Sequence, residues 1–135
     1  MLTFDMSASA FLYCGAVIGP ATRLQDLREH LDGEGDAIPG QPDWSRFTTR
    51  GHSLNASISF YKDRVHSGYF WADVAGAASW DAVEQVEAIR RAAHEQIAAR
   101  LFGAERFASD RISVSLAPDP RSCLEAIFFE FPGSV

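Results

Sequence analysis

The chain has 135 residues, and since one hydrophobic core commonly serves about 100–150 residues, we expect a single globular domain over residues 1–135. The formal net charge is −6 and Lys62 is the single lysine, which excludes the clustered basic surface that nucleic-acid binding requires. Ten phenylalanines and a hydrophobic fraction of 47% supply a packed core, so the two cysteines, far apart in sequence, are expected to be thiols.

An almost unbroken apolar run covers residues 10–19. Only one charged residue, Asp5, precedes this run, whereas a signal peptide carries a basic region there. The run is also too short to cross a bilayer, which takes about 20 residues. We therefore expect a buried strand over residues 11–18, no membrane association and a cytoplasmic protein.

The next two segments differ in composition. Thr22 and Gln25 have the spacing of a capping box, and leucines follow at helical spacing, which predicts a short helix over residues 22–32. Residues 33–46 are rich in Gly, Pro and Asp, the residues that favour turns. We expect this segment to be a long loop within the domain.

Two hairpins and a long helix are expected in the rest of the chain. Apolar and polar residues alternate from residue 53, which predicts an antiparallel hairpin over residues 53–74, and a second one is expected over 111–131. Ser79 as N-cap and Gly103 as stop bound a helix over residues 80–101. Its expected apolar face consists of Ala82, Val83, Val86, Ile89, Ala93, Ile97 and Leu101.

This order of elements predicts an α+β fold. We expect an antiparallel sheet of about five strands, with one long and one short helix packed on one face. The last strand, from Leu124 to Phe131, is apolar at nearly every position, so we expect it to be central and covered on both sides.

No motif for catalysis is recognisable. The chain has no glycine-rich phosphate loop and no Gly-x-Ser-x-Gly elbow, and its histidines are scattered without metal-ligand spacing. We expect no catalytic residue, no metal and no cofactor. Arg90 falls within the apolar stripe of the long helix, where its stem can cover apolar surface or pair with a sheet carboxylate, or its charge can line a pocket for an anionic ligand.

An acidic segment is the most suggestive surface feature. Carboxylates crowd the end of the short helix and the loop after it, and a tryptophan follows in the same loop. Such a run is either a solvated helix end or a docking surface that steers a basic partner and anchors it through an aromatic side chain. The candidate partner-binding residues are Glu29, Asp32, Glu34, Asp36, Asp43 and Trp44.

Several short sequence features in the chain occur together. In the first half, Gly19 precedes the short helix at Thr22. The second half has Trp80 opening the long helix, Arg91-Ala-Ala-His94 within it, Leu101-Phe102-Gly103 at its end and Asp119-Pro120-Arg121 at the turn of the last hairpin.

In these features the chain resembles small bacterial proteins often found as toxin-neutralising immunity proteins, mainly over residues 80–131. Such proteins often carry a Trp-Gly step before the penultimate strand, where this chain has Phe107-Ala108-Ser109. The resemblance implies a non-catalytic inhibitor that occludes its toxin. An acidic inhibitor suits a toxin domain with a basic surface.

Two other classes of function remain open from the sequence. One is a small enzyme or ligand-binding domain with a pocket between the sheet and the long helix, lined by Arg90, His94 or Tyr69. The other is a self-associating subunit, which an exposed apolar strand face would favour. The sequence leaves the oligomeric state unknown.

Overall fold

The computed structural model describes residues 2–50, 53–72, 80–118 and 125–132. The expected cap at Ser79, the side chains of Ala82 and Val83 and the expected turn at residues 119–121 lie outside the described residues. The elements in chain order are β1 (Leu2–Asp5), β2 (Ala10–Tyr13), β3 (Ala16–Ile18), α1 (Leu24–His30), β4 (Glu34–Ala37), β5 (Trp44–Thr49), β6 (Leu54–Tyr61), β7 (Arg64–Ala72), α2 (Trp80–Phe102), β8 (Arg106–Ala108), β9 (Ser113–Pro118) and β10 (Glu125–Glu130).

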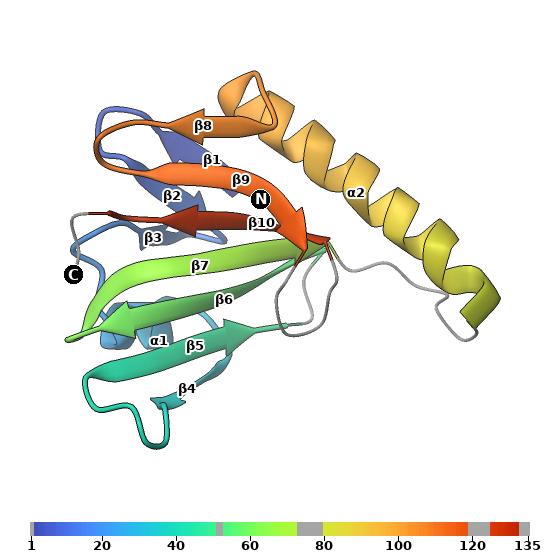
Figure 1. Cartoon of the computed structure of the whole chain (residues 1–135). Coiled ribbons are helices and arrows are strands. Elements are labelled where there is room, and N and C mark those ends of the chain that lie inside the picture. The colour runs from blue at the N-terminus through green and yellow to red at the C-terminus, as the bar shows by residue number, and fades with distance from the viewer. Residues whose placement is uncertain (1, 51–52, 73–79, 119–124, 133–135) are drawn as a thin grey trace.

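The strands form two antiparallel sheets. Over the described residues, the larger sheet has seven strands in the order β4-β5-β6-β7-β10-β9-β8, and the smaller one has the order β1-β2-β3. In Figure 1 the larger sheet faces the viewer, α1 and the smaller sheet lie behind it, and α2 runs past one end of its strands. This architecture confirms the expected α+β class, with seven strands in the sheet rather than about five.

The pairing of β6 with β7 and of β9 with β10 confirms both expected hairpins. β10 lies between β7 and β9, so the apolar last strand is inside the sheet, as its sequence predicts. The expected cover on both sides is wrong, because on the side away from the core Phe128 is only half-buried and Glu130 is exposed. One side of β10 contributes Ile127 and Phe129 to the core, and the other side carries the half-buried Phe128.

The apolar run at the N-terminus is a hairpin and not the single strand expected over residues 11–18. β2 and β3 pair with Tyr13 opposite Ala16, and Cys14 and Gly15 form the turn between them. Both turn residues have positive φ, 50° for Cys14 and 86° for Gly15. Two such residues make a tight turn whose twist matches that of the flanking strands. A cysteine at this position gave no turn signal in the sequence.

The hydrophobic core lies between the two sheets. Phe11 of β2, Phe70 of β7 and Phe129 of β10 meet there, all buried. The centroid of the Phe11 ring lies 5.2 Å from that of Phe70 and 5.0 Å from that of Phe129. Because these rings come from both sheets, they join the two layers.

Gly68 of β7 provides the room that this aromatic packing needs. A Cβ atom at Gly68 would lie 2.7 Å from the Phe129 ring and 2.7 Å from the backbone oxygen of Ser57. The oxygen belongs to the neighbouring strand and cannot move without disturbing the pairing of β6 with β7. We expect Gly68→Ala to lower the free energy of unfolding by about 1–3 kcal/mol, measured by urea denaturation. An unchanged urea midpoint would contradict this close approach.

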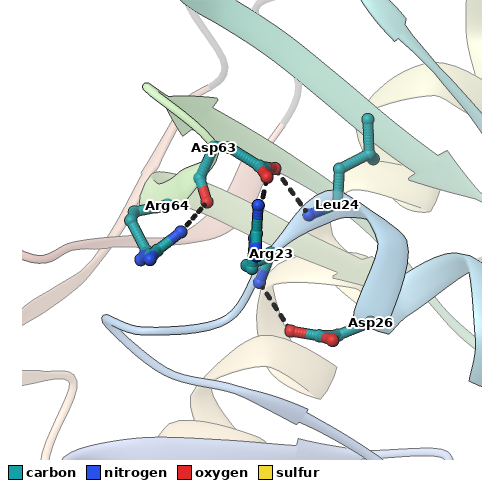
Figure 2. Close-up of polar contacts among 5 residues, drawn as sticks. All are labelled: Arg23, Leu24, Asp26, Asp63 and Arg64. Atoms are coloured by element: carbon teal, nitrogen blue, oxygen red, sulfur yellow. Dashed lines mark hydrogen bonds and ion pairs between the residues drawn. The ribbon is translucent and has the colours of Figure 1, made fainter.

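The N-terminus of α1 is held by a distant turn (Figure 2). Asp63, in the turn between β6 and β7, accepts hydrogen bonds from the backbone N–H of Leu24 at 3.2 Å and from Nε of Arg23 at 2.9 Å. Partial burial opposes the charge of Asp63, but these bonds and the charges of Arg23 and Arg64 outweigh it and lower the pKa of the carboxyl group. The carboxylate therefore fixes α1 against the large sheet.

The capping box expected from Thr22 and Gln25 is wrong. α1 begins at Leu24, and the backbone N–H of Arg23 donates to the carboxylate of Asp26 at 2.9 Å. The Thr22 hydroxyl instead holds the preceding turn, where it accepts from the N–H of Gly19 at 3.0 Å. Because the Thr22 hydroxyl bonds the backbone of this turn, it does not cap α1.

Helix α2 confirms the expected long helix and most of its expected apolar face, since Val86 is buried and Ala93, Ile97 and Leu101 are partly buried against the core. Ile89, expected on the apolar face, is 58% exposed, whereas Arg90 and His94 are buried. Val86, Arg90, His94 and Ala98 follow one another at intervals of four residues, so all four lie on one side of the helix, and all four are buried. Over the described residues, no helix combines the length and apolar character that a bilayer crossing requires.

Candidate functional site

The acidic residues singled out in the sequence lie near one edge of the larger sheet. Glu29 is on α1, Asp32 follows that helix, Glu34 and Asp36 are on β4, and Asp43 comes directly before β5. All five are exposed. Within the described residues, none of the five takes part in an ion pair. We call these residues the acidic edge.

The loop expected over residues 33–46 is wrong at both ends, because the segment contains β4 and the first three residues of β5. Residues Glu34–Ala37 form β4 and pair with β5, and Glu34 lies opposite Thr48. β4 is the outer strand of the sheet and its sequence, Glu-Gly-Asp-Ala, has little intrinsic strand preference. Pairing with β5 imposes the strand, so its composition could not reveal it.

Glu34 and Asp36 point to the side of the sheet away from the core. Gly35 between them lies on the core side, where a Cβ atom would meet Leu24 at 2.8 Å and Phe47 at 3.1 Å. Because neighbouring residues of a strand alternate in direction, the two carboxylates lie on the opposite side. The pairing places Asp36 opposite Arg46 of β5.

A hollow of about 370 Å³ lies beside these two carboxylates. It opens on the side of the sheet that carries Arg46 and Thr48, and Nε of Arg46 is buried without a hydrogen-bond partner among the described residues. The hollow is therefore lined by both negative and positive side chains, Glu34, Asp36 and Arg46. Its lining residues are Glu34, Asp36, Ala37, Ile38, Pro39, Arg46 and Thr48.

Trp44 is half-buried rather than free. Its ring centroid lies 5.1 Å from that of Tyr61 and 5.0 Å from that of His66. Asp43 before it has a positive φ of 72°, which turns the chain into β5. Trp44 thus lies next to the acidic edge but belongs to an aromatic group on the sheet.

That aromatic group extends across the side of the larger sheet that points away from the smaller sheet, which we call the open face. In Figure 1 this face is turned towards the viewer, and no described helix lies in front of it. Tyr69 lies opposite Phe128 with ring centroids 5.3 Å apart, and Trp71 is 5.4 Å from Tyr69. The half-buried rings of the open face are Trp44, Tyr61, His66, Tyr69, Trp71 and Phe128.

The open face was not predicted from the sequence. One signal was present, because Tyr69 and Trp71 alternate with the core residues Phe70 and Ala72, so that both sides of β7 carry large or apolar side chains. A strand with this pattern has a second side that something else can contact. The small residues between the rings lie on three strands and are Asn55, Ser57 and Ser59 on β6, Ser67 on β7 and Ser115 on β9.

Arg90 and His94 form a polar contact between α2 and the end of β7. The backbone N–H of Ala72 donates to Nε2 of His94 at 2.8 Å, and Nε of Arg90 donates to the carbonyl oxygen of Ala72 at 3.1 Å. Glu87 bonds Arg90 and also accepts from the backbone N–H of Glu125 at 3.1 Å. These side chains satisfy strand-end groups of β7 and β10, which explains a charged residue on the buried side of the helix.

The pocket considered for a small enzyme or ligand-binding domain could be lined by Arg90, His94 or Tyr69. The structure does not bring them together, because Arg90 and His94 bind the backbone of Ala72 whereas the Tyr69 ring lies on the open face. Burial and the nearby charge of Arg90 lower the pKa of His94 to about 4. His94 is therefore neutral near pH 7 and serves as an acceptor for the backbone.

Comparison with known proteins gives a likeness of fold. No protein-family model matches the chain, and no curated protein matches it. The chain is similar to a chain of the solved structure described as Rhs1-CT in complex with cognate immunity protein RhsI1, with 14% identity and a TM-score of 0.58. The match covers 100% of this chain and 90% of that chain. It confirms, at the level of fold, the resemblance to toxin-immunity-type α+β proteins.

Proposed function

We propose that this chain is a non-catalytic protein-binding module, a bacterial immunity protein that neutralises a cognate toxin domain by covering it. The observation that carries this proposal is the fold, which over the whole chain is similar to a chain from a complex of a toxin domain with its immunity protein. Neutralisation of an intracellular toxin places the protein in the cytoplasm. In this proposal residues 1–135 form a single binding domain.

The charge of the protein favours a basic toxin domain as partner. The net charge is −6, and the acidic edge holds five exposed carboxylates without an ion pair among the described residues. Complementary charge raises the rate at which two proteins meet and keeps wrong partners apart. We assign the first contact with the partner to the acidic edge together with Trp44. The bound protein then inhibits by steric occlusion, because it covers the basic surface of the toxin domain.

Removing charge from the acidic edge tests this assignment. The triple variant Asp32→Asn, Glu34→Gln and Asp36→Asn should associate about ten-fold more slowly with the cognate toxin domain, which is to be sought in the reading frames next to the gene for this chain. The three side chains are exposed, so the thermal midpoint should change little. The rate is measured by surface plasmon resonance at low and high salt, and the difference between variant and parent should vanish at high salt.

A matched control removes equal charge elsewhere. Glu95→Gln, Glu105→Gln and Asp110→Asn change the net charge by the same amount on α2 and near β8, far along the sheet from β4. This control should associate at more than half the parental rate. If both triple variants slow association equally, only the total charge matters and the acidic edge has no special role.

A further inference from the structure

We infer that the open face is the surface on which the basic protein partner finally docks, with Trp71, Tyr69 and Phe128 as its anchors. The inference rests on the proposed function for the identity of the partner, and it adds where the complex is held together. The acidic edge guides the approach, and the aromatic rings beside it hold the partner.

The rings of the open face have the properties of interface anchors. Each is half-buried and contacts a neighbouring ring at about 5 Å, as Tyr69 does with Phe128 at 5.3 Å and with Trp71 at 5.4 Å. Such neighbours hold the rings in place, so little side-chain freedom is lost on binding. Tyrosine and tryptophan are also the residue types that most often dominate binding energy.

The distribution of charge on the open face matches that of a protein interface. Its centre carries rings, serines and Asn55, and charged residues surround this centre. They are Glu34 and Asp36 on β4, Arg46 on β5, Arg106 on β8, Glu130 at the end of β10, and Arg50, whose guanidinium lies 6.0 Å from the centroid of the Trp71 ring. Interfaces have a centre depleted of charge and enriched in aromatic residues, surrounded by a polar rim. One row of the pairing register shows this sequence across all seven strands: Glu34, Thr48, Ser57, Tyr69, Phe128, Ser115 and Arg106.

Charge decides between a basic partner and a second copy of this chain. Two copies each carry a net charge of −6 and repel each other as they approach. The carboxylates of Glu34 and Asp36 point to the same side of the sheet as the rings, so a basic surface that meets them also lies over the rings. The occupant that fits is therefore a protein with basic side chains next to an apolar patch.

The test uses two variants on the open face, Trp71→Ala and Phe128→Ala, each of which removes one half-buried anchor. With the cognate toxin domain, each should raise the dissociation constant at least about ten-fold, mainly through faster dissociation. That effect should persist at high salt, unlike the effect of the acidic edge.

The control lies on the outside of the smaller sheet. Leu12 and Val17 are neighbours there, 45% and 57% exposed, and the double change to alanine should leave the dissociation constant within two-fold. Thermal denaturation confirms that each variant is folded. This inference is overturned if the parent binds the toxin domain and the folded variants Trp71→Ala and Phe128→Ala bind it equally well. The proposed function would then still stand.

Two further outcomes separate the alternatives. If the parent does not bind the toxin domain at all, the proposed function fails and this inference with it. If light scattering shows that the parent is a dimer which Trp71→Ala returns to a monomer, the open face is occupied by a second copy and the inference of a basic partner is overturned.

Discussion

Phe70→Ala is expected to lower the free energy of unfolding by about 3–5 kcal/mol, as removal of a fully buried phenylalanine does. The Phe70 side chain is fully buried, and its ring centroid lies 5.2 Å from Phe11, 5.6 Å from Tyr13 and 5.5 Å from Phe129. Those partners come from both sheets and cannot all close around the cavity. Urea denaturation followed by tryptophan fluorescence measures the loss.

Leu12→Ala is the matched control for this substitution, because Leu12 is 45% exposed on the outer side of the smaller sheet. Its loss should stay within about 0.5 kcal/mol, as is usual for surface positions. A loss below about 1 kcal/mol for Phe70→Ala would show that the two sheets do not share a core.

Acid is expected to destabilise the protein through His94. Its pKa is lowered from 6.5 to about 4 in the folded state, first by burial and then by the charge of Arg90. A group whose folded pKa is depressed favours folding in its neutral form. The contribution is therefore complete above about pH 6.5 and is lost as the pH falls towards 4. The free energy of unfolding should decrease by about 3 kcal/mol over this window from His94 alone.

The variant His94→Gln isolates this effect. Glutamine does not titrate, yet its amide oxygen can accept the hydrogen bond that the backbone N–H of Ala72 gives to His94. The variant should lose most of the pH dependence between pH 6.5 and 4 that the parent shows in urea denaturation. Equal pH dependence in both proteins would assign the acid sensitivity to other groups.

The secondary structure that follows from local pattern was predictable. The alternation over residues 54–60 correctly predicted β6, and Gly103 correctly predicted the end of α2. Both signals depend only on residues that are close together in the sequence. β4 was missed since pairing with β5 creates it, and the hairpin turn at Cys14 was missed since cysteine seldom takes positive φ.

The buried side of α2 shows the limit of helical periodicity. Apolar spacing placed Ile89 inside, but the strand end at Ala72 has polar backbone groups that only side chains such as Arg90 and His94 can satisfy. The sequence marked Arg90 as unusual without revealing its partner. The acidic edge could be recognised from the sequence, whereas the rings of the open face come from four strands, β5, β6, β7 and β10, and meet only when these strands pair.

Co-expression with the cognate toxin domain tests the central claim most directly. Growth of the host cells is measured with the toxin domain alone, with this chain added, and with an unrelated toxin domain in place of the cognate one. The proposal predicts that this chain restores growth against the cognate toxin domain only. Persistent growth arrest, with the folded chain present in excess of the toxin domain, would contradict it.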